Sequence, residues 1–243
     1  MPNRSAAGYD IRGISMSLTY DSAVGLVRSL YDRSIKTPPV LDPLRYFPNA
    51  PRFTERWREI RDEALAAKLD DIPRFHEIMA AQSDISANDG RDWRMLILKA
   101  YGVELPQNLR RCPVIASLLE QTPEAVSCVL SFLAPGKHIP VHRGPFRGIL
   151  RFHLMLSMPR DQAGRPACVM EIDGVPFRLD EGASLLWDDT YPHEVWNRSN
   201  EVRVALLLDV WRTGMPAHLD LLSRACIGLV QAGMRLRGAT YGG

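Results

Sequence analysis

The second half of this chain is a succession of short apolar runs separated by turn residues, and no other feature constrains its fold as strongly. In chain order the runs are AVSCVLSFL, GILRFHLMLSM, ACVMEI, VPFRL, ASLLW and VRVALLLDVW. The pair Asp173–Gly174 between two of them favours a two-residue hairpin turn, because both residue types tolerate positive φ. Helical segments do not separate these runs, which argues against a parallel α/β sheet. The pattern predicts a double-sheet jelly roll or a barrel.

The rest of the chain is typical of helices that flank such a core. Apolar positions at helix-like spacing and the turn residues between them define the expected elements. These are helices over 18–31, 52–69, 113–120 and 217–237, a loop over 82–91 and a strand over 93–101. We therefore expect a helical N-terminal region (1–90) that packs on the core, a jelly-roll core (91–213), and a C-terminal helix and tail (214–243).

Charge and cysteine usage exclude several classes of protein. The 30 basic and 28 acidic residues leave a net charge of +2, which gives no reason to expect a nucleic-acid partner. None of the four cysteines forms a CxxC pair, so neither a zinc ribbon nor a disulfide framework is indicated. The first residues lack the apolar segment of a secretory signal, and no apolar run is long enough to span a membrane. These observations favour a cytoplasmic protein.

The predicted C-terminal helix has two readings. Its apolar residues fit a helix that packs on the sheet. Its arginines, Arg224, Arg235 and Arg237, could instead favour peripheral contact with an acidic or membrane surface. Both readings stay open at this point.

Two of the apolar runs carry charges on one face only. In the run 148–158, leucine and phenylalanine alternate with Arg151, His153 and Met155, and in the last run Arg203 lies among apolar residues. If the leucine faces pack outward on helices, both arginines and the imidazole lie inside the β structure. A buried charge needs a partner, which is either an internal ion pair or a bound anion. A pair of guanidinium groups would suit a small dicarboxylate.

Two histidines precede these arginines at similar distances. His142 lies nine residues before Arg151, and His193 lies ten residues before Arg203. Both are expected at strand edges, where neutral imidazoles are natural ligands for a first-row metal. In the facial triad of non-haem iron oxygenases a carboxylate follows the first histidine by two residues, and here that position is Gly144.

Other side chains near His193 leave the third ligand position open. Asp188 and Asp189 could replace the missing carboxylate, orient His193 from behind, or cap a turn. Glu194 adjoins His193 and should face the opposite way on a strand. Trp187 is expected in the core rather than at a cofactor.

Four stretches resemble the aspartyl/asparaginyl β-hydroxylase family of Fe(II)- and 2-oxoglutarate-dependent oxygenases in residue type, order and spacing. They are SFLAPGKHIPVHRGP, LRFHLML, EGASLLWDDTYPHEVWN and VRVALLLDVW, within residues 93–211. The resemblance implies a mostly β protein, with a double-stranded β-helix of the jelly-roll, cupin-like type and flanking helices. The family has glycine where the carboxylate ligand would be, so Gly144 fits the resemblance.

The resemblance also assigns roles to individual residues. It implies that His142 and His193 bind Fe(2+) and that Arg203 pairs with the distal carboxylate of 2-oxoglutarate. The positions that would hold the co-substrate with it are Trp93, Ser131, Arg151 and His153. The implied reaction consumes O2 and 2-oxoglutarate, hydroxylates an unactivated C–H bond, and releases succinate and CO2.

The substrate is left open by the sequence. The resemblance is compatible with an amino-acid or peptide side chain or another small molecule. The stretches YFPNAPRFTERWREIRDEALA and WRMLILKAYG also resemble the lipid A 2-hydroxylase branch, which acts on an acyl chain, although Gly144 replaces the acid expected in that branch. Two further alternatives are a halogenase, with chloride in the vacant carboxylate position, and a non-catalytic β-barrel that binds an anion.

Overall fold

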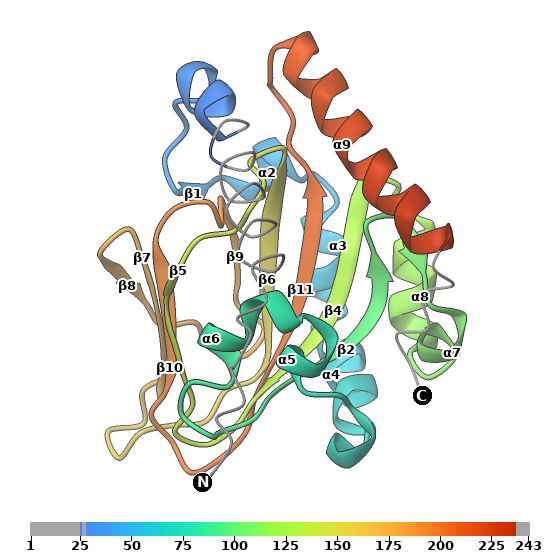
Figure 1. Cartoon of the computed structure of the whole chain (residues 1–243). Helices are drawn as coiled ribbons and strands as arrows, with labels where there is room; N and C mark the ends of the chain where they lie inside the picture. The colour runs from blue at the N-terminus through green and yellow to red at the C-terminus, as the bar shows by residue number, and fades with distance from the viewer. Residues whose placement is uncertain (1–24, 26–27, 237–243) are drawn as a thin grey trace, which may run out of the picture.

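The computed structural model describes residue 25 and residues 28–236. Within this part of the chain, two antiparallel sheets face each other and helices cover the outer side of the larger one (Figure 1). The larger sheet has the strand order β1-β9-β6-β11-β4-β2-β3, and the smaller has the order β5-β10-β7-β8. The strands are β1 (Val40–Leu41), β2 (Trp93–Ala100), β3 (Val103–Glu104), β4 (Ala125–Leu133), β5 (His138–His142), β6 (Ile149–Ser157), β7 (Cys168–Ile172), β8 (Val175–Phe177), β9 (Ser184–Trp187), β10 (His193–Asn197) and β11 (Arg203–Trp211).

Strands β4 to β11 form the predicted jelly roll. The chain passes repeatedly from one sheet to the other, so that β4, β6, β9 and β11 lie together in the large sheet and β5, β7, β8 and β10 form the small one. This is the connectivity of a double-stranded β-helix, and the predicted fold class is confirmed. The Asp-Gly hairpin is also confirmed, because Ile172 pairs with Val175 while Asp173 and Gly174 have φ of 50° and 79°.

Helices occupy the outer face of the large sheet. They and the remaining helical segments are α2 (Pro43–Tyr46), α3 (Ala50–Glu55), α4 (Trp57–Leu65), η1 (Leu69–Asp71), α5 (Phe75–Ile78), η2 (Ala80–Gln82), α6 (Ser83–Ser86), α7 (Pro106–Leu109), α8 (Pro113–Glu120) and α9 (Ala217–Leu236). Phe53 of α3, Ile60 of α4 and Ile115 of α8 share one hydrophobic cluster with Phe152 of β6 and Leu206 of β11. The leucine faces of the strands therefore do pack outward on helices, and the opposite face carries the polar residues.

Several predicted elements agree with the structure and others do not. Helix α8 has the predicted bounds, and strand β2 ends one residue earlier than expected. The helix expected over 52–69 is interrupted at Arg56, where φ is −101° and ψ is 18°, and it ends at Leu65. The predicted loop over 82–91 begins with helix α6, whose Ile85 is buried between the sheets and holds the segment in place. Most of the helix expected over 18–31 lies outside the described residues.

Helix α9 lies along one side of the large sheet. Its buried residues are Leu219, Ser223 and Ile227, and Ile227 packs on Val126 and Ile149. The prediction that this helix packs on the sheet is confirmed. Within residues 28–236, neither α9 nor another helix has the length and apolar character needed to cross a bilayer.

Candidate active site

The two predicted metal-binding histidines lie side by side. His142 ends β5, His193 begins β10, and the two residues are register partners with ring centroids 4.0 Å apart. Nδ1 of His142 lies 2.8 Å from the carbonyl oxygen of Pro140, and Nδ1 of His193 lies 2.9 Å from that of Tyr191. A carbonyl can only accept, so each Nδ1 donates and each Nε2 is left with a free lone pair. This is the tautomer that a metal ligand needs.

The environment keeps both imidazoles neutral. Burial lowers the pKa of His142, and burial together with the neighbouring His142 lowers the pKa of His193 to about 3. Trp187, with 2% of its surface exposed, meets the His193 ring edge-on at 4.6 Å between centroids. Trp187 is thus a core residue, as expected, but it also fixes the position of a candidate ligand. Its place at the end of β9 gives no sequence signal for that contact.

The space of a third protein ligand is taken up by Asp189. A Cβ atom at Gly144 would lie 2.2 Å from Oδ1 of Asp189, so the carboxylate fills the volume in which a side chain at 144 would begin. Burial raises the pKa of Asp189 to about 6, while Arg151 at 3.1 Å opposes this rise. Within the described chain, no three His, Cys, Asp or Glu side chains gather as a ligand set. The two imidazoles therefore remain the candidate metal ligands.

Asp188 has a structural role instead. Its buried carboxylate pairs with Arg147 and Arg212 and accepts from the backbone N–H of Thr190 at 3.1 Å. It caps the turn before β10, which is one of the roles considered from the sequence. The carbonyl of Tyr191, rather than either aspartate, orients the His193 ring.

A second group of predicted residues lies deeper between the sheets and lacks partners. Arg203, with 3% of its surface exposed, has no hydrogen-bond partner at Nε or Nη1, and neither ring nitrogen of His153 has one. The neighbouring thiol of Cys168 contacts the guanidinium, and burial lowers the pKa of Arg203. Burial and then Arg203 lower the pKa of His153. A small apolar cavity between Met155, Met158, Val169, Phe177 and Leu179 adjoins both groups.

A buried guanidinium with two unpartnered nitrogen atoms is costly and needs an explanation. The cavity beside Arg203 contains no acidic side chain among its lining residues. The cavity, about 10 Å³, has room for a single polar atom, such as one carboxylate oxygen, which would supply a missing acceptor.

Arg151 contrasts with Arg203. Its Nε and Nη2 donate to Asp209 at 2.8 and 3.2 Å, and its Nη1 lies 3.1 Å from Asp189. The internal ion pair considered from the sequence is the arrangement observed for Arg151. The residue still lines the pocket in front of the histidines.

Trp93 and Ser131 lie between the paired histidines and the deeper group of Arg203 and His153. The indole N–H of Trp93 donates to the Ser131 hydroxyl at 3.0 Å, and both side chains are buried. The Ser131 hydroxyl keeps its own proton and can donate it to a further acceptor. Ser131 is the register partner of Ala205, two residues from Arg203 on the same face of β11.

A pocket of about 160 Å³ opens in front of the histidines. Its lining includes His142, His193 and Trp93, the charged residues Lys99, Arg143, Arg151, Asp189 and Asp209, and a larger apolar part. The residues of this apolar wall are Phe75, Ile78, Met79, Met95, Ile97, Val129, Leu207 and, from α9, Met234. Sequence reasoning missed the contribution of Phe75, Ile78 and Met79, although they are apolar residues in an otherwise polar stretch.

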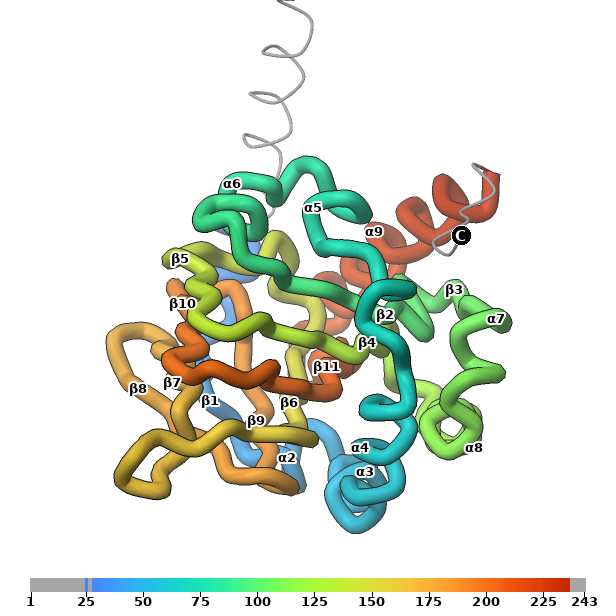
Figure 2. The backbone as a smooth tube through the Cα atoms, turned by 90° about the horizontal axis from the view of Figure 1, so that it is seen from below, coloured from blue at the N-terminus to red at the C-terminus, as the bar shows by residue number. Residues whose placement is uncertain are grey.

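The segment that carries these three residues bridges the two sheets. Helix α5 contacts β2 in the large sheet, and α6 contacts β5 in the small one. Figure 2 shows both helices lying across the same edge of the sandwich. Helix α5 and the residues that follow it form one side of the pocket, and α9 contributes Met234.

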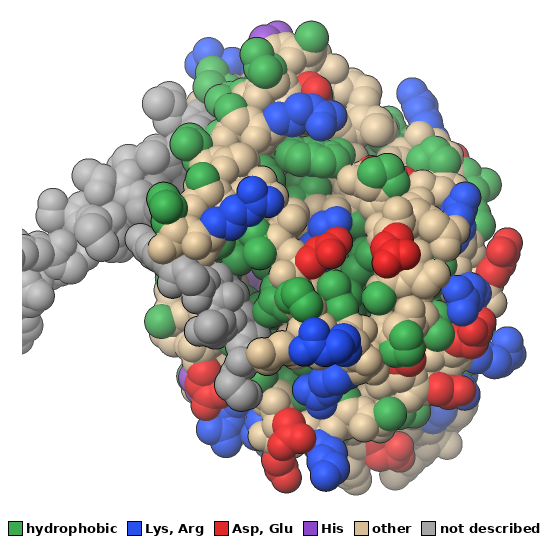
Figure 3. All heavy atoms as spheres, turned by 90° about the vertical axis from the view of Figure 1, so that its right-hand side faces the viewer, with side chains coloured by type: hydrophobic (Ala, Val, Ile, Leu, Met, Phe, Trp, Pro, Cys, Tyr) green, Lys and Arg blue, Asp and Glu red, His purple; other side chains and the backbone are tan. Residues whose placement is uncertain are grey.

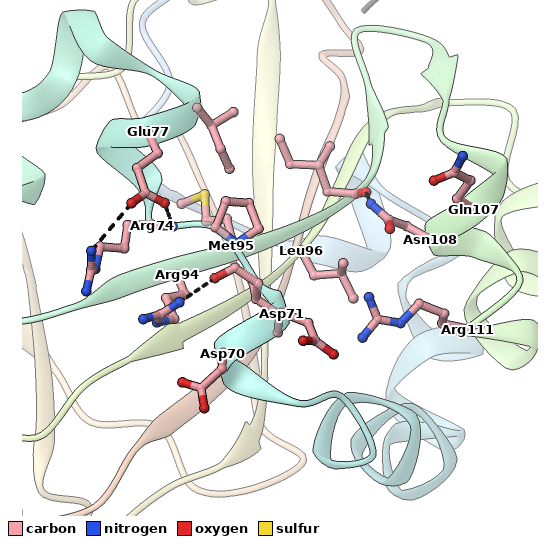
Figure 4. Close-up of a pocket in the computed structure, with 14 residues that line it drawn as sticks. Asp70, Asp71, Arg74, Glu77, Arg94, Met95, Leu96, Gln107, Asn108 and Arg111 are labelled. Carbon is pink, nitrogen blue, oxygen red and sulfur yellow. Dashed lines mark hydrogen bonds and ion pairs between the residues drawn. The ribbon is translucent and has the colours of Figure 1, made fainter. Parts of the chain in front are cut away.

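A wider depression of about 1010 Å³ lies along the edge of β2 (Figure 4). It contains neither histidine, and part of its charge is engaged in ion pairs and hydrogen bonds. Arg74 pairs with Glu77 at 3.4 Å, and Nη1 of Arg94 donates to the carbonyl of Ile72 at 2.6 Å. The smaller pocket is therefore the candidate active site.

Comparison with known proteins identifies the family of this chain. The family described as aspartyl/asparaginyl β-hydroxylase matches residues 54–213, and the chain belongs to this family, as its sequence motifs suggest. An ornithine lipid ester-linked acyl 2-hydroxylase from Rhizobium tropici is 32% identical over 202 residues, which cover 82% of this chain and 70% of that protein. Membership of a hydroxylase family supports an oxygenase enzyme.

More distant relatives match shorter shares of their own length. The aspartyl/asparaginyl β-hydroxylase of Homo sapiens is 29% identical over 192 residues, which cover 76% of this chain and 24% of that protein. The chain thus spans about a quarter of that relative. Among solved structures, the cupin domain of Schizosaccharomyces pombe Cnp3 has a TM-score of 0.33 and 10% identity, covering 50% of this chain and 66% of that one.

Proposed function

We propose that this protein is an Fe(II)- and 2-oxoglutarate-dependent dioxygenase that hydroxylates an unactivated carbon of a lipid acyl chain. The observation that carries the choice of substrate is the pocket, whose apolar wall leads to the paired histidines. One oxygen atom of O2 would enter the new hydroxyl group and the other would enter succinate, while 2-oxoglutarate loses CO2. The acyl substrate of the Rhizobium tropici relative is of the same chemical class.

The paired histidines fit a ferrous ion. His142 and His193 each direct a neutral Nε2 lone pair away from a carbonyl-bound Nδ1. Imidazole is a suitable ligand for iron, and two protein ligands leave positions for water and a chelating oxoacid. When bound, iron would supply the activation of dioxygen that protein side chains cannot provide.

The deeper group fits the co-substrate. Arg203 and His153 are buried with unmet hydrogen-bonding capacity, and Ser131 has a proton to donate. A guanidinium pairs with a carboxylate through two parallel hydrogen bonds, so Arg203 would bind the distal carboxylate of 2-oxoglutarate. Trp93 would hold the Ser131 hydroxyl in place.

The remaining residues would position the substrate and exclude water. Phe75, Ile78 and Met79 close one side of the pocket and offer no hydrogen bonds to a hydrocarbon chain. Arg151 is neutralised by Asp209 and Asp189, so an uncharged chain can pass it without leaving a bare charge in an apolar site. A second cation lines the pocket, Arg143, whose Nη1 donates to the carbonyl of Thr190 at 2.9 Å, and it could meet an acidic group at the polar end of a substrate.

We further place the reaction in a reducing, cytoplasmic compartment. The four cysteines are free thiols, and Cys112, Cys128 and Cys168 are buried. Burial raises the pKa of Cys112 to about 12, which keeps its thiol protonated and unreactive.

The proposal is tested by ligand binding and product analysis. Anaerobic addition of Fe(II) and 2-oxoglutarate should give a visible charge-transfer absorption, which His142→Ala and His193→Ala should abolish together with succinate formation. His138→Ala is the matched control, because His138 lies on the same strand but bonds to Glu194 and stacks on Trp196. It should keep the absorption.

Substrate panels separate the alternatives. Acyl lipids should raise succinate release and yield a hydroxylated chain, whereas aspartyl or asparaginyl peptides should not. A product that carries chlorine when chloride is present would indicate a halogenase. If the wild-type protein gives neither the charge-transfer absorption nor succinate, the protein would be a non-catalytic β-barrel that binds an anion.

A further inference from the structure

Helix α9 exposes an apolar face to solvent. The helix carries four of the ten large hydrophobic side chains that are exposed in the described chain. They are Leu221 (70% exposed), Leu229 (75%), Val230 (43%) and Leu236 (89%). A monomeric protein usually keeps such residues scattered, so their concentration on one helix indicates a binding surface.

Three of these residues, all leucines, belong to a continuous stripe, and Val230 lies on another side of the helix. Leu221, Leu229 and Leu236 follow helical spacing on the side opposite to the buried Leu219, Ser223 and Ile227. The positions between them are exposed and small, namely Ala225, Gly228 and Ala232. The stripe (Leu221, Ala225, Gly228, Leu229, Ala232 and Leu236) is therefore apolar along its whole length.

Basic residues flank the stripe, and acidic residues are few. Arg224 and Arg235 are exposed on the same side of the helix, and the acidic side chain of α9, Asp220, pairs with Arg224 at 2.9 Å. On the face drawn in Figure 3, green and blue side chains dominate the upper third, while most red ones lie lower. An apolar stripe with a basic margin is typical of a helix that lies in the interface of an anionic membrane.

The same helix reaches the active site. Met234 of α9 lines the pocket that contains His142 and His193, and it lies on the side of the helix that also carries the buried Ile227, opposite the stripe. A bilayer in contact with the stripe would therefore lie about one helix diameter, roughly 10 Å, from this edge of the pocket.

We propose that α9 docks the protein on the surface of an anionic lipid bilayer and presents the pocket mouth to the acyl chains. This inference deepens the proposed function and rests on it for its purpose, whereas the docking itself rests on α9 alone. The helix lies in the interface and does not span the membrane, in agreement with its length and polarity.

The test is co-sedimentation of the full chain with vesicles. Wild type should bind vesicles of phosphatidylglycerol and phosphatidylcholine in equal parts, and should bind pure phosphatidylcholine vesicles more weakly. Leu221→Glu combined with Leu229→Glu should reduce binding to the anionic vesicles by more than about tenfold. Each change removes a leucine that the bilayer would cover and adds a negative charge that the anionic lipids repel.

A matched control is available elsewhere on the surface. Leu65→Glu combined with Val175→Glu adds the same charge at exposed apolar residues of α4 and β8 (54% and 52% exposed) and should leave binding unchanged. The Fe(II) and 2-oxoglutarate absorption, measured without lipid, should be the same in both double variants and wild type. It confirms that each variant is folded.

The outcomes distinguish the two proposals. Binding that survives Leu221→Glu with Leu229→Glu, or equal binding to neutral and anionic vesicles, would overturn the docking proposal. So would a concentration-dependent dimer that these changes abolish, because the stripe would then be an interface between two copies of the chain. Failure of every acyl lipid to stimulate succinate, with vesicle binding intact, would overturn the substrate assignment and leave the docking surface standing.

Discussion

Arg151 and Arg203 lie on the same inner face of the large sheet, on adjacent strands, but their surroundings differ. Asp209 is the register partner of Arg151 across the ladder, and Asp189 adds a second carboxylate. Arg203 has a thiol beside it and no carboxylate. We infer that a partly buried cation with its counter-charge in the sheet, such as Arg151 (28% of its side chain exposed), maintains the fold. A fully buried cation without a carboxylate, such as Arg203, marks the place of an external anion.

The largest effect is expected at Arg203. Arg203→Met removes the partner of the co-substrate carboxylate, and losing a buried charged pair costs about 2–5 kcal/mol of binding, or roughly 30- to 5000-fold in 2-oxoglutarate half-saturation. Unfolding of the ligand-free variant should need as much urea as wild type or more, because an unpaired charge is gone. A titration with an unchanged half-saturation would remove the distinction between the two arginines.

The opposite pattern is expected at Arg151. Arg151→Met leaves Asp209 and Asp189 without their cation and should lower the free energy of unfolding by about 3 kcal/mol, as judged by urea denaturation. Adding Asp209→Asn to this variant should recover part of the loss, since one unpaired carboxylate is removed. If Arg151→Met instead keeps wild-type stability and loses only 2-oxoglutarate affinity, Arg151 is a ligand-binding residue like Arg203.

A substitution at Cys168 can remove the difference between the two arginines. Cys168→Asp places a carboxylate next to Arg203 and gives it the internal partner that Arg151 already has. Competition with the co-substrate should raise the 2-oxoglutarate half-saturation by about tenfold or more. Cys168→Asn has nearly the same shape without the charge, and its half-saturation should stay within a few-fold of wild type.

The smallest effect is expected at Ser131. Ser131→Ala leaves the buried indole N–H of Trp93 unpaired and removes one donor to the co-substrate. We expect a loss of about 1–2 kcal/mol in stability, measured by thermal unfolding, and a rise of a few-fold in 2-oxoglutarate half-saturation. A loss as large as that of Arg203→Met would show that the hydroxyl, and not the guanidinium, dominates binding.

Much of the fold and the site could be predicted because strand alternation is local. The alternation of residue types in β6 and β11 predicts that Arg151, His153 and Arg203 lie on the inner face of the sheet. The Asp173–Gly174 turn was predictable because its backbone requires residues that accept positive φ. The pairing of His142 with His193 followed from the family resemblance and agrees with their register.

The remaining features depend on contacts between distant parts of the chain. The partners of Arg151 come from Asp209 and Asp189, and only the register of three strands brings them together. The pocket wall formed by Phe75 and Ile78 depends on how α5 lies across the sheets, which residue periodicity in so short a helix cannot specify. The break of the predicted helix at Arg56 likewise has no proline or glycine to announce it.

The close approach of Gly144 and Asp189 makes these two positions interdependent. They share a volume that holds one carboxylate, so a residue with a side chain at 144 requires a smaller residue at 189. Converting the site to three protein ligands would thus take a paired exchange, Gly144→Asp with Asp189→Gly, in which either change alone produces a collision or a void. A single substitution at either position of this chain would therefore not by itself supply a third ligand.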